Sequence, residues 1–330
     1  MSKPSTSTAL AVPNAGPLVA RPSIALALGG GGARGLAHIL MLEVFDELGL
    51  KPKIIAGTSI GALFGAAYAS GLPAALIRAH AEQILSQRLD IARLLFAARA
   101  EPIMKFFNVL PVRFALLQPE QLLESVLPSR VARDFAHLQI PLRVVATDFY
   151  AQEQVILSEG PVRAAVAASM ALPAIFAPVV REGRLLMDGG LVNPLPFDII
   201  RAQADITVAI DVSGASTGPG KHPQPSAFSA LMSSSQILQR SIVREKLKLE
   251  QPDIYIDVEV DEFHVLQFHR FKAVLEAALP AKDKLRRQLL RVLASQTAET
   301  LPAQAPAEAE RTGRKHRLPR LKRLGQGRRR

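Results

Sequence analysis

The sequence predicts an α/β protein built around a mostly parallel central sheet. Short apolar runs that are typical of buried strands alternate with segments whose apolar residues recur at helical spacing. This strand–helix–strand–helix order favours parallel strands with helices packed on the faces of the sheet. Apolar residues make up 48% of the 330-residue chain, which is enough to fill one sizeable α/β core.

The strands and first helices follow from these runs. An apolar run at Ile24–Leu28 ends in four glycines and predicts the first strand. A helix is expected from Leu36 to Leu48, with Gly49 as its stop. The same patterns predict a strand over Lys53–Ala56, a helix over Ile60–Ala69, and strands at Leu142–Asp148 and Ile206–Asp211.

The rest of the chain is expected to be helix and loop. Residues 73–128 look mainly helical, with interruptions at Pro102, Pro111 and Pro119, and residues 213–227 form a Ser-, Gly- and Pro-rich loop. Helical patterns follow over Ala227–Leu249 and Val265–Leu293, the second interrupted at Pro280. We therefore expect a flexible leader at 1–21, one domain at 22–295 and a disordered basic tail at 296–330.

The positive charge belongs to that tail. The chain has 40 Lys and Arg against 29 Asp and Glu, a net charge of +11. Residues 311–330 hold ten of the basic residues and no acidic residue, so the remainder is nearly neutral. The tail is expected to bind anionic lipid or nucleic acid, with a merely solubilising role as the alternative.

Composition excludes several classes of protein. The chain has no cysteine, so disulfides, thiolate zinc sites and cysteine nucleophiles are excluded, and neither metal nor cofactor is expected. The leader lacks the pattern of a signal peptide, and no apolar run is long enough to span a bilayer. We expect a cytoplasmic location, with or without peripheral contact to the inner face of the membrane.

The segment Gly57-Thr58-Ser59-Ile60-Gly61 is a G-x-S-x-G between a predicted strand and a predicted helix. In that context the pattern is typical of a nucleophile elbow, in which a strained turn exposes the serine hydroxyl. The alternative is an ordinary Gly/Ser turn at a helix start. Gly57 and Gly61 would leave room for neighbouring backbone.

The glycine run from Gly29 to Gly35 contains a G-x-G-x-x-G at Gly30, Gly32 and Gly35. A dinucleotide site of this type needs an acidic residue at the end of the second strand, and Ser59 stands there instead. We therefore favour a loop whose backbone N–H groups bind an oxyanion, with Arg34 orienting it or supporting its charge. A plain tight turn is the other interpretation.

A third block, Asp188-Gly189-Gly190, follows the apolar run Leu185–Met187. An Asp at a strand end is by itself more often a turn former than a catalyst. Ser169 has Ala and Met as neighbours and is expected to be buried and hydrogen-bonded.

Together, the blocks Gly30-Gly31-Gly32-Ala33-Arg34-Gly35, Gly57–Gly61 and Asp188–Gly190 resemble the signature of the patatin-like phospholipase family in sequence, order and spacing. Residues 168–178, which include Met170 and Phe176, also look like a family segment. The resemblance covers about residues 22–212. It implies a three-layer α/β/α fold and the hydrolysis of lipid acyl esters by a Ser–Asp dyad.

By this likeness Ser59 is the nucleophile and Asp188 its base. Gly30, Gly31 and Gly32, aided by Arg34, would form the oxyanion hole. A carboxylate is a weak base, so Asp188 would need desolvation to raise its pKa toward the working range. The implied partner is a lipid or other acyl ester.

Two alternatives stay open at this point. A triad would need a histidine after Asp188, for which His222, His264, His269 and His316 are available, whereas His38 is expected to pack or cap beside the glycine loop. A regulatory protein could instead keep the fold and act through its basic tail.

The predicted helical insertion at 84–117 is rich in large apolar residues. Such stripes usually belong to a core, and the alternative is an acyl pocket or a lid that meets lipid. The residues concerned are Ile84, Leu85, Leu94, Leu95, Phe96, Ile103, Met104, Phe106 and Phe107.

Overall fold

The computed structural model describes residues 21–87, 117–214, 224 and 227–299. Predictions that fall on residues 1–20, 88–116, 215–223, 225–226 and 300–330 lie outside the described residues. These include the leader, most of the apolar insertion, the prolines at 102 and 111, His222, His316 and the basic tail.

The described residues form a mixed sheet of eight strands, in the order β5-β6-β3-β2-β1-β7-β8, with β4 also paired to β3. Strands β3, β2, β1, β7 and β8 run parallel, and β4, β5 and β6 form the antiparallel part. The predicted mostly parallel sheet is thus confirmed. The strands are β1 Ile24–Leu28, β2 Ile54–Thr58, β3 Leu142–Asp148, β4 Glu153–Leu157, β5 Val179–Arg181, β6 Arg184–Asp188, β7 Ile206–Asp211 and β8 Ile254–Asp257.

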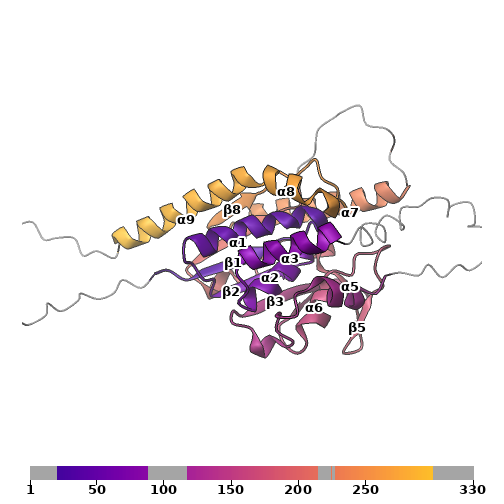
Figure 1. Cartoon of the computed structure of the whole chain (residues 1–330). Coiled ribbons are helices and arrows are strands. Elements are labelled where there is room, and N and C mark those ends of the chain that lie inside the picture. The colour runs from indigo at the N-terminus through magenta and orange to yellow at the C-terminus, as the bar shows by residue number, and fades with distance from the viewer. Residues whose placement is uncertain (1–20, 88–116, 215–223, 225–226, 300–330) are drawn as a thin grey trace, which may run out of the picture.

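Helices cover both faces of the sheet and complete three layers (Figure 1). Strand β1 separates two apolar cores by alternation: Ile24, Leu26 and Leu28 belong to the larger core, and Ala25 and Ala27 to the smaller one. The smaller core contains Val243 of α7 and Phe197, whereas the larger core takes in Met232 of α7 and side chains from the other helices. The helices are α1 His38–Glu47, α2 Ile60–Ala69, α3 Ala74–Gln87, α5 Pro119–Val126, α6 Val162–Ser169, α7 Ala227–Leu249, α8 Phe271–Ala277 and α9 Leu279–Glu299.

Several predicted boundaries were wrong. The helix expected from Leu36 begins as a 3₁₀ turn over Gly32–Ala37, because the glycine loop tightens the chain before α1. Strand β2 runs through Thr58, two residues beyond the predicted end. The break expected at Pro280 falls at Ala278, because a proline in the first turn of α9 needs no N–H partner. Helix α9 reaches Glu299, past the helix end predicted at Leu293.

Strand β3 brings two distant parts of the chain together. Residues Val144 and Val145 pair with both β2 and β4, and residues 146–148 pair with both β4 and β6. Since a strand has only two edges, β2 and β6 must share the edge opposite β4. Thr58 at the end of β2 pairs with Val145, and Asp188 at the end of β6 pairs with Ala146. The two strand ends therefore meet at consecutive residues of β3.

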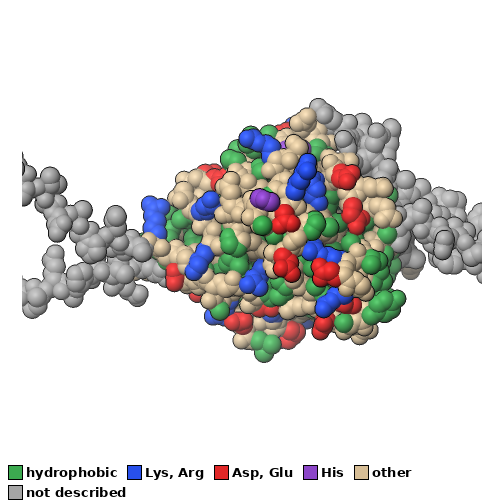
Figure 2. All heavy atoms as spheres, turned by 90° about the horizontal axis from the view of Figure 1, so that it is seen from below, with side chains coloured by type: hydrophobic (Ala, Val, Ile, Leu, Met, Phe, Trp, Pro, Cys, Tyr) green, Lys and Arg blue, Asp and Glu red, His purple; other side chains and the backbone are tan. Residues whose placement is uncertain are grey.

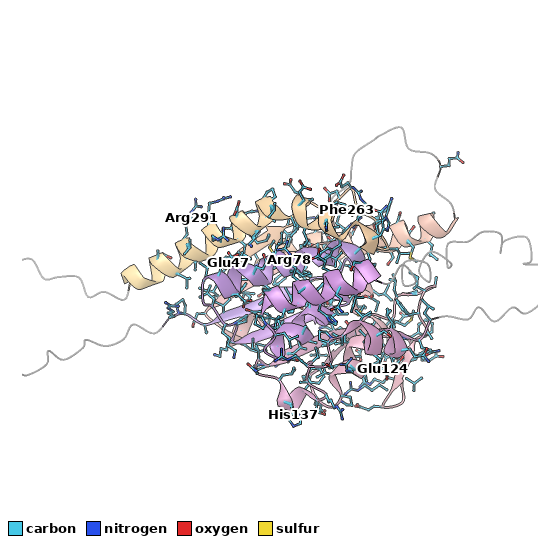
Figure 3. The ribbon with its side chains drawn as sticks, viewed as in Figure 1. Glu47, Arg78, Glu124, His137, Phe263 and Arg291 are labelled. Atoms are coloured by element: carbon cyan, nitrogen blue, oxygen red, sulfur yellow. The ribbon has the colours of Figure 1, made fainter. Side chains whose placement is uncertain are left out.

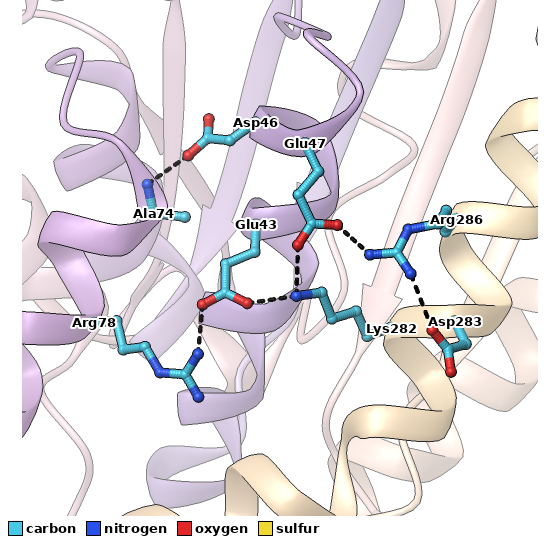
Figure 4. A network of polar contacts seen from close by, with 8 residues as sticks. All are labelled: Glu43, Asp46, Glu47, Ala74, Arg78, Lys282, Asp283 and Arg286. Carbon is cyan, nitrogen blue, oxygen red and sulfur yellow. Dashed lines mark hydrogen bonds and ion pairs between the residues drawn. The ribbon is translucent and has the colours of Figure 1, made fainter.

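Ion pairs join helices α1, α3 and α9, which pack on the larger core (Figure 4). Lys282 of α9 lies 2.6 Å from Glu43 and 2.8 Å from Glu47 of α1, and Arg78 of α3 lies 2.8 Å from Glu43. Elsewhere, on the face seen in Figure 2, Lys and Arg are interspersed with Asp and Glu. Within the described ranges, none of the helices combines the length and apolar character needed to cross a membrane.

Candidate active site

Ser59 stands at the turn between β2 and α2. Its backbone angles are φ 54° and ψ −120°, a left-handed conformation that a non-glycine residue adopts at a cost of about 1–3 kcal/mol. Ser59 is half-buried, so its hydroxyl stays accessible at the N-terminus of α2. The geometry is that of a nucleophile elbow.

The glycines around Ser59 make this turn possible. A Cβ at Gly61 would lie 2.1 Å from the carbonyl oxygen of Leu28, and one at Gly57 would lie 2.6 Å from Cα of Ala62. A side chain at Gly35 would run into Ile60, at 2.2 Å from its Cγ2. The motif glycines thus let β1, β2 and α2 approach more closely than any side chain allows.

Asp188 faces Ser59 across the junction of strands. The Ser59 hydroxyl donates a 2.7 Å hydrogen bond to Oδ2 of Asp188, and the Gly190 N–H donates a 2.7 Å bond to Oδ1. The Thr147 hydroxyl donates to the Asp188 carbonyl at 2.8 Å, which fixes the backbone against β3. Gly189 is needed here because its Cβ would lie 2.1 Å from the Val145 carbonyl oxygen.

Burial makes Asp188 a stronger base than an ordinary carboxylate. Its exposed fraction is 3%. Desolvation raises its pKa to about 6, although the hydrogen bonds from Ser59 and from the Gly190 N–H oppose that rise. The carboxyl group is therefore mostly ionised at neutral pH and close to the range in which a base exchanges protons readily.

Ser169 holds the backbone of the elbow in place. Its side chain is fully buried, accepts a hydrogen bond from the Ser59 N–H at 2.8 Å and donates one to the Val145 carbonyl at 2.6 Å. The prediction that Ser169 is buried and hydrogen-bonded is confirmed. What the sequence does not reveal is that its partner is the candidate nucleophile.

The glycine loop lies beside Ser59. A Cβ at Gly30 would be 3.5 Å from Cβ of Ser59, and Gly30, Gly31 and Gly32 all line the same cleft as Ser59 and Asp188. The Gly30 N–H, however, donates to the Pro194 carbonyl at 2.9 Å. The expectation that Gly30 supplies an oxyanion donor is therefore wrong in this detail, because its donor is already used.

Arg34 anchors this loop to the far side of the cleft. Its guanidinium is buried and donates to the carbonyl of Phe263 at 2.7 Å, to the carbonyl of Ser213, and to Gln236 of α7 at 3.3 Å. Phe263 is labelled in Figure 3 on the segment before α8. Arg34 was predicted either to orient the glycine loop or to support its charge. These contacts fit the first role.

His38 supports the loop from the core side. Its buried Nε2 lies 2.8 Å from the Gly29 carbonyl, so this nitrogen carries the proton and donates. Burial lowers the pKa of His38 to about 4, so the ring is neutral at physiological pH. This matches the packing role expected of it.

Two of the histidines considered for a triad, His264 and His269, lie within the described residues. His264 and His269 are exposed, whereas both carboxylate oxygens of Asp188 are engaged by Ser59 and Gly190. The direct serine–aspartate contact leaves no gap for an imidazole between them.

The cleft over this pair has two kinds of wall. Leu122, Met170, Leu172, Phe176 and Phe268 make one side apolar. Ser213, Ser235, Gln236 and Gln239 are polar and come from the end of β7 and from α7. No sequence motif marks the lining residues of α7, because only the fold brings that helix to the site.

The fold and the site define an α/β protein with a glycine loop, a serine elbow and a buried aspartate in one cleft. The family profile of the patatin-like phospholipases matches residues 26–201, more than half of the chain. The chain belongs to the patatin-like phospholipase family.

Curated relatives agree with this assignment. An uncharacterized NTE family protein of Mycobacterium bovis is 38% identical over 205 residues, which are 62% of this chain and 53% of that protein. Patatin-like phospholipase domain-containing protein 7 of Rattus norvegicus is 33% identical over 58% of this chain and 14% of its own length. The chain therefore spans about half of the first relative and a small part of the second.

Two solved structures are more distantly similar. VipD from Legionella pneumophila gives a TM-score of 0.43 at 16% identity, covering 81% of this chain and 67% of VipD. Human GIVD cytosolic phospholipase A2 gives 0.41 at 12% identity, covering 84% and 60% of the two chains.

Proposed function

We propose that this protein is a lipid acyl hydrolase that cleaves acyl esters with a Ser59–Asp188 dyad. Membership of the patatin-like phospholipase family supports lipid hydrolysis. The observation that carries the dyad is the 2.7 Å hydrogen bond from the Ser59 hydroxyl to Asp188, made at a strained elbow that opens into a cleft.

In the first half of the reaction, Asp188 takes the proton of the Ser59 hydroxyl while Oγ attacks the ester carbonyl. The tetrahedral oxyanion is stabilised by backbone N–H groups of the glycine loop at Gly31 and Gly32, with the N-terminus of α2 adding its positive end. Collapse expels the alcohol, which takes a proton from Asp188, and leaves an acyl ester on Ser59.

In the second half, water enters in place of the alcohol. Asp188 removes its proton, the hydroxyl attacks the acyl ester, and the free acid leaves as Ser59 regains its proton. Ser169 and Thr147 hold the two reacting groups in register through their backbone contacts. Arg34 keeps the glycine loop in place and transfers no proton in this scheme.

Reaction with a fluorophosphonate probe tests the proposal. The probe phosphonylates only an activated serine, so the wild-type protein should be labelled once, at Ser59, and Ser59→Ala should not be labelled. Ser169→Ala is the matched control: it removes a buried serine near the site and should leave labelling at Ser59, at a reduced rate. A regulator without catalysis would give no labelling of the wild-type protein.

A further inference from the structure

A second cavity adjoins the cleft that holds Ser59. It lies among α2, α3 and α5, which Figure 1 shows together on one side of the sheet. The two cavities share Ile60, Leu122, Met170 and Phe268 in their walls. Ile60 directly follows Ser59, so the second cavity opens close to the candidate nucleophile.

The walls of this cavity are almost wholly apolar. Among the described residues that line it, His80 alone has a polar side chain, and its Nε2 lies 2.9 Å from the Val126 carbonyl. The other lining residues are hydrophobic, and they include Ile84 and Leu85 from the start of the apolar insertion. A wall of this chemistry favours a hydrocarbon chain over any polar group.

The two sides of the site therefore differ in what they can hold. Helix α7 brings three polar side chains to the cleft, Ser235, Gln236 and Gln239, together with the apolar Met232. Among the described residues that line the second cavity, only His80 is polar. We propose that the second cavity binds the fatty acyl chain of the substrate, and that the polar leaving group lies toward α7. This assignment rests on the proposed acyl hydrolase function.

Helix α2 gives the cavity its length. Ile60, Leu63, Phe64 and Ala67 line it, and their i, i+3, i+4, i+7 spacing places them along one face of the helix. From Ile60 to Ala67 that face spans about 10 Å at 1.5 Å per residue. Ala67 is thus the lining residue of α2 farthest from Ser59.

Two small side chains in the wall of this cavity leave room for the acyl chain. Ala67 of α2 and Ala81 of α3 both line the cavity. A larger residue at either position would shorten the space without touching Ser59, Asp188 or the glycine loop. Chain-length preference should respond to these two positions.

The experiment compares p-nitrophenyl esters of acetate, butyrate, octanoate and dodecanoate. In the wild type, kcat/KM should rise by up to about fourfold per added methylene until the cavity is filled. Ala67→Leu should lower kcat/KM for dodecanoate at least about tenfold and leave acetate and butyrate within about twofold. Ala81→Leu supplies the same test from the other wall if Ala67→Leu does not fold.

Leu76→Ala is the matched control, because Leu76 is 46% exposed on α3 and does not line the cavity. It should leave the chain-length profile unchanged. Folded Ala67→Leu and Ala81→Leu proteins with the wild-type profile would overturn the proposal.

Binding separates this proposal from the proposed function. Calorimetric titration of decanoate into Ser59→Ala protein reports on the cavity without turnover. Tight binding that Ala67→Leu weakens would uphold the cavity assignment even if no ester were hydrolysed. Ester hydrolysis without any effect of Ala67→Leu on decanoate binding would refute the cavity and leave the function standing.

Discussion

The hydroxyl of Ser59 and the carboxylate of Asp188 meet because the strands before them end at consecutive residues of β3. Thr58 pairs with Val145 and Asp188 with Ala146, so residues 129 apart in sequence come within hydrogen-bonding distance. Ladder hydrogen bonds, rather than the side chains themselves, hold the pair in register. Substitutions of Ser59 or Asp188 can therefore alter chemistry while leaving the sheet intact.

Loss of either member of the pair should nearly abolish ester hydrolysis. Ser59→Ala removes the attacking oxygen and Asp188→Asn removes the base, so each should lower kcat by at least about 10²–10³. The double variant should be little worse than either single one, since both belong to one unit. The measurement is the steady-state rate on a soluble ester, with circular dichroism as the check on folding.

His264→Ala and His269→Ala are the controls for this prediction, and both should keep most of the activity. A well-folded Asp188→Asn enzyme with near-normal turnover would remove Asp188 from the mechanism. Loss of turnover in a folded histidine variant would instead indicate a triad.

The rate should depend on pH through Asp188. Burial raises the pKa of this carboxyl to about 6, and only the ionised form can accept the proton of Ser59. We expect kcat/KM to rise about tenfold per pH unit well below pH 6 and to level off above it. Initial rates from about pH 4.5 to 8.5 would check this, and a profile that is flat through pH 6 would argue against Asp188 as the base.

The same shift should appear in stability. Because the pKa of Asp188 rises from 3.8 unfolded to about 6 folded, the native state holds its proton more tightly, and stability from this group is lost as the pH rises from about 4 to 6. Asn cannot ionise. Over that pH window, the free energy of unfolding of Asp188→Asn should therefore rise relative to that of the wild type, by up to about 3 kcal/mol.

Urea unfolding of both proteins at several pH values provides this measurement. The difference between the two proteins must be used, because His38 has its pKa lowered to about 4 and changes stability in the opposite direction over much of the same range. A difference in unfolding free energy that does not vary with pH would contradict the burial of an ionised Asp188.

Two glycines of α2 should respond differently to the same substitution. A Cβ at Gly61 would lie 2.1 Å from the Leu28 carbonyl oxygen. The nearest neighbours of a Cβ at Gly65 would be side-chain carbons, of Ile55 at 3.2 Å and Leu142 at 3.3 Å. Gly61→Ala should cost about 3 kcal/mol or more. Gly65→Ala should change stability by less than about 1 kcal/mol, because helix propensity offsets the tighter packing. Thermal unfolding of the pair would test this, and equal losses would contradict it.

The basic tail remains a separate prediction, since residues 311–330 lie outside the described residues. We expect it to contact anionic lipid headgroups through its ten Lys and Arg residues. Sedimentation with phosphatidylserine-containing vesicles at low salt should fall when these residues are removed. Equal binding by the full and shortened chains would leave the tail a solubilising role, and neutral vesicles serve as the control.

The sequence by itself indicated the candidate catalytic residues and most of the segments that build the parallel sheet. The runs that became β1, β3 and β7 are buried and apolar, so hydrophobic periodicity was sufficient to find them. Strands β4, β5 and β8 were missed, β5 and β8 because they have only three and four residues. In addition, β4 has mainly exposed residues, which give little apolar signal.

Only the tertiary structure decided how these parts meet. No local pattern states that β6 runs antiparallel along the same edge of β3 as β2, because that pairing depends on backbone hydrogen bonds between distant segments. The raised pKa of Asp188, the use of the Gly30 N–H by Pro194, and the apolar cavity beside Ile60 all follow from that packing. Burial and proximity are properties of the assembled chain, and they turn a set of motifs into a site.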